Sequence, residues 1–385
     1  MTDFEQIDPK TATWEQLMEY VSSENANVGK SNWLIFHYLQ QNYKTVGSLK
    51  ARTLLALYMK TRVMRSSLVD SCMLGMAVKI SETYADFKLP KFLEAWGYDA
   101  CLRDEDLHRD TGKDGRQYLS LKERVDRALQ TYLLHHPDEN TGECEAIVSM
   151  YAVKVFEKEV RERKCRYVKL VGGNGSEFIA DSHQFPCRPW EISGRMFDVL
   201  TRVSKQGKER AAEIVVSRKR VEEVFPAEVG YVDYIDDSHG HIHIYDSQSR
   251  HFVAEKQTVA PRFHVDKGGF VSFCPIIVNG DHFKSAAVIG VMDKGQGLRA
   301  FGTYDAKVDN VNREDCYIHY TIESEIKPTP EGEITQSGFA STAALPDDVR
   351  NGICAGAGVR LLLFLKRGKD GAKHNYVADI RPAAE

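Results

Sequence analysis

The chain has 385 residues, of which 42% are hydrophobic and 28% are charged, the composition of an ordinary soluble globular protein. No apolar run in it approaches the ~20 residues that a membrane-spanning helix needs, and the formal net charge is −4. The acidic start Met-Thr-Asp-Phe-Glu-Gln lacks the profile of a signal peptide, and the eight cysteines are scattered without a Cys-x-x-Cys pair. We therefore expect a cytoplasmic protein of two to four domains, without a membrane partner and with free thiols.

Residues 1–164 are predicted to be helical. Apolar residues recur at helical spacing from Trp14 to Val21, and Ser120 with Glu123 has the spacing of a capping box. The expected helices cover 14–21, 33–40 after a Ser31 cap, 49–65, 66–82, 87–96 ending at Gly97, 120–135 and 142–164. The runs at 58–68, 76–79 and 92–97 resemble the tetratricopeptide-like segments fused to cold-shock-like modules in some bacterial conflict-system proteins. That resemblance implies an interaction platform for a protein partner.

A pattern recurs three times in the rest of the chain. It has three parts: an aromatic or His followed by Ile, a Gly-led apolar strand, and a closing Ala-x-Ile strand. The first part is at 178–179, 241–242 and 317–318, the second at 194–200, 268–277 and 358–365, and the third at 212–214, 287–289 and 378–380. Each unit has the size of a small β-barrel.

The second unit most closely resembles the cold-shock domain, a five-stranded OB-type barrel that binds single-stranded nucleic acid. Residues 238–242 lie where that family has Gly-Phe-Gly-Phe-Ile, with His239 and His241 in place of the two Phe. Residues 251–254, which contain Phe252, lie where Val-Phe-Val-His is expected, and 269–273 and 283–289 resemble the fourth and fifth strands. The third unit keeps Tyr317-Ile318, and the first keeps Phe178-Ile179. The resemblance implies base stacking by these side chains.

Basic residues concentrate in the first unit. Residues 158–220 have 15 Lys and Arg against 8 Asp and Glu, a net of +7, whereas residues 221–385 have 17 against 24, a net of −7. Clustered cations on one small barrel favour contact with phosphates. The predicted phosphate-binding residues are Lys164, Arg166, Lys169, Lys205, Lys208 and Arg210.

The alternating His239, His241 and His243 allow a second interpretation, a metal or small-ligand sensor. No Cys or acidic partner stands at ligand spacing, so base stacking is favoured over metal binding. Residues 295–300 match a dinucleotide fingerprint in letters, yet they are better explained as the linker between the second and third units.

No catalytic motif stands out, so a non-enzymatic protein without a cofactor is expected. The predicted fold class is a helical domain followed by three OB-type barrels, with boundaries at 1–164, 165–222, 223–292 and 298–385. The predicted function is binding of single-stranded RNA or DNA, with RNA favoured. The alternatives are a protein–protein adaptor with purely structural barrels, and the sensor built on the His239–His243 face.

Overall fold

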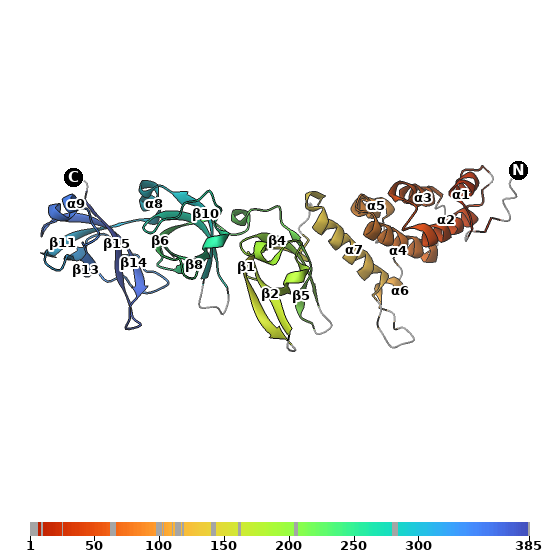
Figure 1. The fold of residues 1–385 in the computed structure, drawn as a ribbon. Helices are drawn as coiled ribbons and strands as arrows, with labels where there is room; N and C mark the ends of the chain where they lie inside the picture. Colours follow the sequence, from red (N-terminus) through yellow and green to blue (C-terminus); the bar gives the residue numbers. More distant parts are fainter. Residues whose placement is uncertain are drawn as a thin grey trace. The chain divides into compact units, whose positions relative to one another are not determined.

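The computed structural model describes residues 7–383, apart from 9–10, 25, 62–66, 98–101, 103, 110, 112–116, 118, 140–143, 161–162, 204–206 and 279–283. The chain divides into two compact units, Met1–Ile147 and Val148–Glu385. The first unit is helical (Figure 1). Its helices are α1 (Trp14–Val21), α2 (Val28–Asn42), α3 (Ser48–Thr61), α4 (Ser67–Thr83), α5 (Leu89–Trp96), α6 (Asp104–Leu107) and α7 (Leu121–His135).

The ends of these helices follow local capping chemistry. The Ser120 hydroxyl accepts a hydrogen bond from the Glu123 N–H while the Glu123 carboxylate accepts one from the Ser120 N–H, so the predicted capping box of α7 is confirmed. Gly97 ends α5 in the left-handed conformation with φ of 62°, as predicted. Ser31 was predicted to cap α2, but Asn27 is the cap, and Ser31 is buried one turn into the helix.

The helix predicted over 142–164 is wrong. Strand β1 (Ile147–Val160) occupies most of that range and pairs with β2 (Arg163–Gly172). Only Met150, Tyr151 and Ala152 are buried along β1, and its last four residues are exposed. The burial pattern therefore lacks the sustained alternation by which a strand is recognised in sequence. The first sheet consequently includes residues before 165.

The second unit contains three five-stranded sheets in chain order (Figure 1). The first sheet also contains β3 (Glu177–Asp181), β4 (Met196–Val203) and β5 (Glu209–Val216). The second contains β6 (Glu228–Asp236), β7 (His241–Asp246), β8 (His251–Glu255), β9 (Phe270–Ile276) and β10 (Lys284–Met292). The third contains β11 (Tyr304–Asn312), β12 (Tyr317–Ile322), β13 (Ser337–Ser341), β14 (Gly358–Arg367) and β15 (Lys373–Pro382), with α9 (Asp347–Gly352) before β14.

All three sheets have the same strand order. Counted along the chain within each sheet, the strands lie in the order third, second, first, fourth, fifth. In the second sheet, β10 also pairs in parallel with β8, which closes the sheet into a barrel. This is the five-stranded arrangement of OB-type folds, and it confirms the predicted fold class of a helical domain followed by OB-type modules. The Gly-led strands are the fourth strands, and the Ala-x-Ile strands are the fifth.

Each sheet encloses its own apolar core, and further clusters connect neighbouring sheets. The segment between the second and third sheets is the short helix α8 (Lys294–Phe301), where the sequence predicted a linker. A Cβ atom built on Gly297 of α8 would lie 2.2 Å from the Phe270 ring, so only glycine permits this close packing.

Among the helices of the described residues, none is long and apolar enough to cross a membrane.

Candidate nucleic-acid interface

An irregularity in the first strand of each sheet gives the three sheets a common register. The pairing with the second strand shifts between Ala152 and Lys154, between Val232 and Tyr234, and between Val308 and Asn310. Such a bulge increases the local twist and bends the strand. Directly after the shift, the second strands place Lys169, His243 and His319 opposite the first strands. These three residues therefore occupy equivalent positions in the three sheets. Their partners on the third strands are Ile179, Val253 and Phe339.

This register corrects the repeat proposed for the first unit. His241 and Tyr317 begin the second strands of their sheets, but Phe178 lies on the third strand of its own sheet, opposite Leu170. The first-sheet residue at the His241 position is Tyr167 on β2, opposite Phe156. Only one residue in two faces outward along a strand, and Phe178 faces the core with 9% exposure. The predicted stacking role of Phe178 is therefore wrong.

The second sheet presents histidines on its outer face. Ile242 and Ile244 point into the barrel, whereas His241 and His243 alternate with them and face outward, as predicted. His243 lies 5.6 Å from the Tyr234 ring and 5.2 Å, nearly parallel, from the His251 ring. We call Tyr234, His241, His243 and His251 the His face.

His239 was predicted to alternate with His241 and His243 along one strand, but it lies in the β6–β7 turn, with its ring 6.1 Å from that of His241. Its Nδ1 is 2.7 Å from a carboxylate oxygen of Asp236. Hydrogen bonds from the Ser238 hydroxyl and from His239 hold the pKa of the Asp236 carboxyl well below its usual range. The His239 side chain is 70% exposed, so it remains accessible at the edge of the His face.

Phe252 does not belong to this surface. It is fully buried, packs 5.1 Å from Phe273 inside the barrel, and has no face to offer a base. Its neighbours on β8, His251 and Val253, face outward instead. The cold-shock resemblance placed the strand correctly, but the predicted stacking role of Phe252 is wrong.

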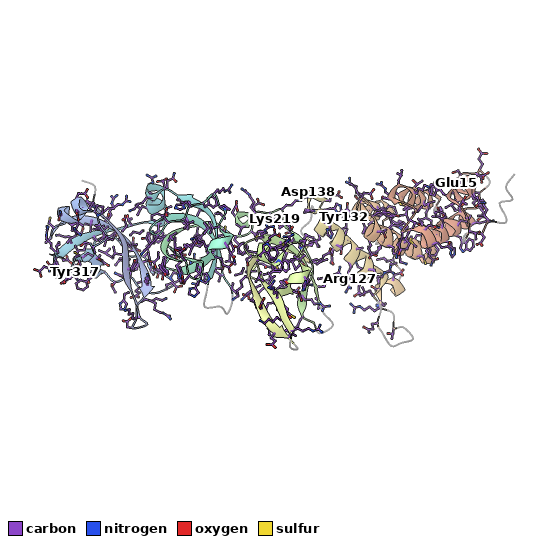
Figure 2. All side chains as sticks on the ribbon, in the orientation of Figure 1. Glu15, Arg127, Tyr132, Asp138, Lys219 and Tyr317 are labelled. Carbon is purple, nitrogen blue, oxygen red and sulfur yellow. The ribbon has the colours of Figure 1, made fainter. Side chains whose placement is uncertain are left out.

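The third sheet carries an aromatic patch that the sequence showed only in part. Tyr317 was predicted, and Figure 2 marks it on this sheet. Phe339 on β13 lies 5.7 Å from Tyr317 and 4.9 Å from His319, and it is 66% exposed. His319 Nδ1 is 2.8 Å from Asp309 Oδ2, which orients the imidazole. The alternation of Tyr317 and His319 along one strand could have indicated an exposed aromatic face. The position of Phe339 beside them could not be predicted, because it depends on strand pairing.

The predicted phosphate-binding cations of the first sheet have different surroundings. Lys164, Arg166, Lys208 and Arg210 are exposed, whereas Lys169 is largely covered. Arg166 Nε is 2.9 Å from Glu157, and Lys169 Nζ is 3.5 Å from Glu177. These two ion pairs reduce the charge that Arg166 and Lys169 offer to a phosphate. Lys205 lies outside the described residues.

The described residues contain no group of three or more His, Cys, Asp or Glu side chains placed to hold a metal ion. Two imidazoles of the His face bond to each other, with His243 Nδ1 3.0 Å from His251 Nε2. This bond engages one nitrogen of each of these two imidazoles.

The histidine pair makes the stability of the second sheet depend on pH. Burial, with His243 nearby, lowers the pKa of His251 from 6.5 to about 4, and burial also lowers that of His243. The unfolded chain therefore takes up a proton before the folded one does as the pH falls. The free energy of unfolding is therefore unaffected by this pair above about pH 6.5. It decreases as the pH falls from about 6.5 to about 4, and it changes no further below that value. The other charged groups around His251 are Asp233, Lys366 and Glu331.

We expect a loss on the order of 3 kcal/mol over this window, measured as the hydrogen-exchange protection of β7 and β8 against pH, corrected for the intrinsic exchange rates. The variant His251→Asn should show a clearly smaller loss. The control variant His264→Asn, at a side chain that is 92% exposed, should behave as wild type. Equal pH dependence in wild type and His251→Asn would contradict the assignment.

No family model matches the chain, and no curated protein matches it. Among solved structures, the chain is similar to Drosophila Unr CSD456, with 10% identity over 63% of this chain and 98% of that one, at a TM-score of 0.20. It is also similar to a replication protein A heterotrimer bound to ssDNA, with 10% identity over 62% and 93% of the two chains, at a TM-score of 0.19. Scores this low do not bear on function, so the functional proposal depends on the strand order and the exposed rings of this chain.

Proposed function

We propose that this protein is a non-enzymatic binder of single-stranded nucleic acid, with RNA as the preferred ligand. The observation that carries the proposal is the gathering of exposed rings on the first three strands of two successive OB-type sheets. Tyr234 is 49% exposed beside His243, and Phe339 is 66% exposed beside His319. A large ring left in water at such a position is available to stack on a base, an interaction worth about 1–3 kcal/mol per base.

The three sheets differ in charge, and we propose that they make different contacts with the nucleic acid. The second and third sheets lie in the acidic part of the chain and supply stacking surfaces, while the cations of the first sheet supply phosphate contacts. With the exposed side chains of Lys164, Lys208 and Arg210 among the contacts, three neutralised phosphates would make log K fall against log salt concentration with a slope of about −2. Imidazole nitrogens on the His face offer hydrogen-bonding partners for 2′-hydroxyls and base edges, which supports the preference for RNA.

The decisive experiment is fluorescence anisotropy with labelled RNA and DNA of the same mixed sequence, about 20 nucleotides long, at several salt concentrations. Tyr234→Ala and Phe339→Ala should each weaken binding about 5- to 150-fold, because each removes one stacking ring. Trp33→Ala is the matched control: Trp33 is an aromatic of the helical unit with 49% exposure, and its loss should leave the Kd unchanged.

Absence of binding by the wild-type protein at low salt would contradict the proposal and favour the protein–protein adaptor. Binding that is unaffected by either aromatic substitution would show that the outer faces are not the interface.

The helical unit is proposed as the tetratricopeptide-like platform for a protein partner. Its exposed Trp33 and Leu49, the latter 72% exposed, support this role. We also propose that the domain boundaries follow the strands, so that the first barrel begins at β1 and the third follows α8.

A further inference from the structure

The second and third sheets share one buried aromatic cluster. Its members are Tyr231, Tyr245, Phe270, Leu298, Phe301, Leu362 and Phe364, contributed by both sheets and by α8. Tyr245 stands on the outer face of β7 and would be exposed in an isolated barrel, yet it is only 8% exposed. The Phe364 ring covers it at 4.3 Å in a stacked arrangement. The outer face of the second sheet is therefore in direct contact with the third sheet at Tyr245.

A series of ring contacts crosses this junction. His243 stacks on His251 at 5.2 Å, and His251 on Tyr245 at 4.8 Å. Tyr245 stacks on Phe364 at 4.3 Å, and Phe364 lies 5.2 Å from Tyr376 on β15. Tyr376, at the far end, is 36% exposed. The accessible rings of the His face and of Tyr376 thus belong to one packed assembly.

Polar contacts hold the junction in place. Lys366 Nζ is 2.5 Å from Asp233 Oδ2, and the Leu365 N–H donates to the Ser249 hydroxyl at 2.9 Å. Asp233 is 5% exposed and lies at the bulge of β6, where the equivalent residue of the third sheet is Asp309. Lys366 Nζ also lies 4.5 Å from the Tyr376 ring centroid, so the lysine contacts both a carboxylate and a ring.

We propose that this junction is a nucleotide-binding subsite, so that a single strand on the His face continues onto the third sheet without leaving the protein. The base packs against Tyr376 and the His243–His251 pair, whose imidazole nitrogens hydrogen-bond its edge. Burial lowers the pKa of both imidazoles, which favours their neutral forms. Lys366 directs one N–H toward Asp233 and carries two further donors, which suit the adjacent phosphate. The inference depends on the proposed function, and it makes the second and third sheets one composite site.

The test compares Tyr376→Ala with Tyr376→Phe in the full chain, using the same labelled RNA. Loss of the ring should weaken binding about tenfold, while the Phe variant, which keeps the ring, should remain within about twofold of wild type. His374→Ala is the matched control, because this side chain lies two residues away on the same strand and is 59% exposed. It should bind as wild type.

The outcomes separate this inference from the proposed function. If wild type binds and Tyr234→Ala weakens binding while Tyr376→Ala does not, the junction subsite is wrong and the His face stands. If wild type does not bind RNA, the proposed function itself fails.

A second measurement uses only wild-type protein, so its result does not depend on whether the Ala variant folds. Wild-type protein is irradiated with RNA that contains 4-thiouracil, and the crosslinked peptides are identified by mass spectrometry. Crosslinks to β15 around Tyr376 together with β7 support the composite site, and crosslinks confined to β7 and β8 overturn it.

Discussion

Replacing Phe364 by Ala should lower the free energy of unfolding by about 3–5 kcal/mol, the range for removing a fully buried Phe. Phe364 is 0% exposed and contacts Tyr231, Tyr245 and Tyr376 at ring distances of 5.8, 4.3 and 5.2 Å. Because two of these rings belong to the second sheet, the cavity would open at the junction and weaken the coupling between the two sheets. Hydrogen exchange followed by mass spectrometry is the appropriate measurement, since a multidomain chain does not unfold in two states.

The expected pattern is faster exchange in both β7–β8 and β14–β15. Phe273→Ala is the control, because Phe273 is equally buried but lies inside the second sheet. It should cost a similar free energy and leave β14–β15 protected. Unchanged exchange of β7–β8 in Phe364→Ala would show that the junction does not couple the two sheets.

Replacing Phe252 by Ala should likewise cost about 3–5 kcal/mol and unfold the second sheet. Phe252 is fully buried against Phe273, with the Arg250 guanidinium 5.5 Å from its ring. Any loss of RNA binding in this variant would follow from unfolding, because the ring has no exposed face. The stability of the second sheet is measured, as for Phe364→Ala, by hydrogen exchange of its own strands.

Phe252→Leu separates packing from recognition. Leucine keeps much of the buried volume, so this variant should lose less stability and keep the wild-type Kd within about twofold. A folded Phe252→Leu protein with about tenfold weaker RNA binding would restore the stacking role that the structure removes.

Local features of this protein were determined by its sequence. The capping box of Ser120 and Glu123 and the glycine stop at Gly97 involve residues within one turn of each other, and both appear in the structure as predicted. The repeated Gly-led and Ala-x-Ile segments likewise became the fourth and fifth strands of each sheet. The helical region as far as His135, the succession of three OB-type sheets and the outward alternation of His241 and His243 could therefore be predicted.

Only the tertiary structure decided which aromatic residues face outward. A shift of one residue exchanges the two faces of a strand, and the register here depends on a bulge in the first strand of each sheet. Phe178 and Phe252 were therefore predicted on the surface although they are core residues, and Phe339 was missed. The covering of Tyr245 by Phe364, more than a hundred residues away, depends on packing between two sheets. No local pattern encodes such a contact, because burial at the junction is set by the shape of both partners.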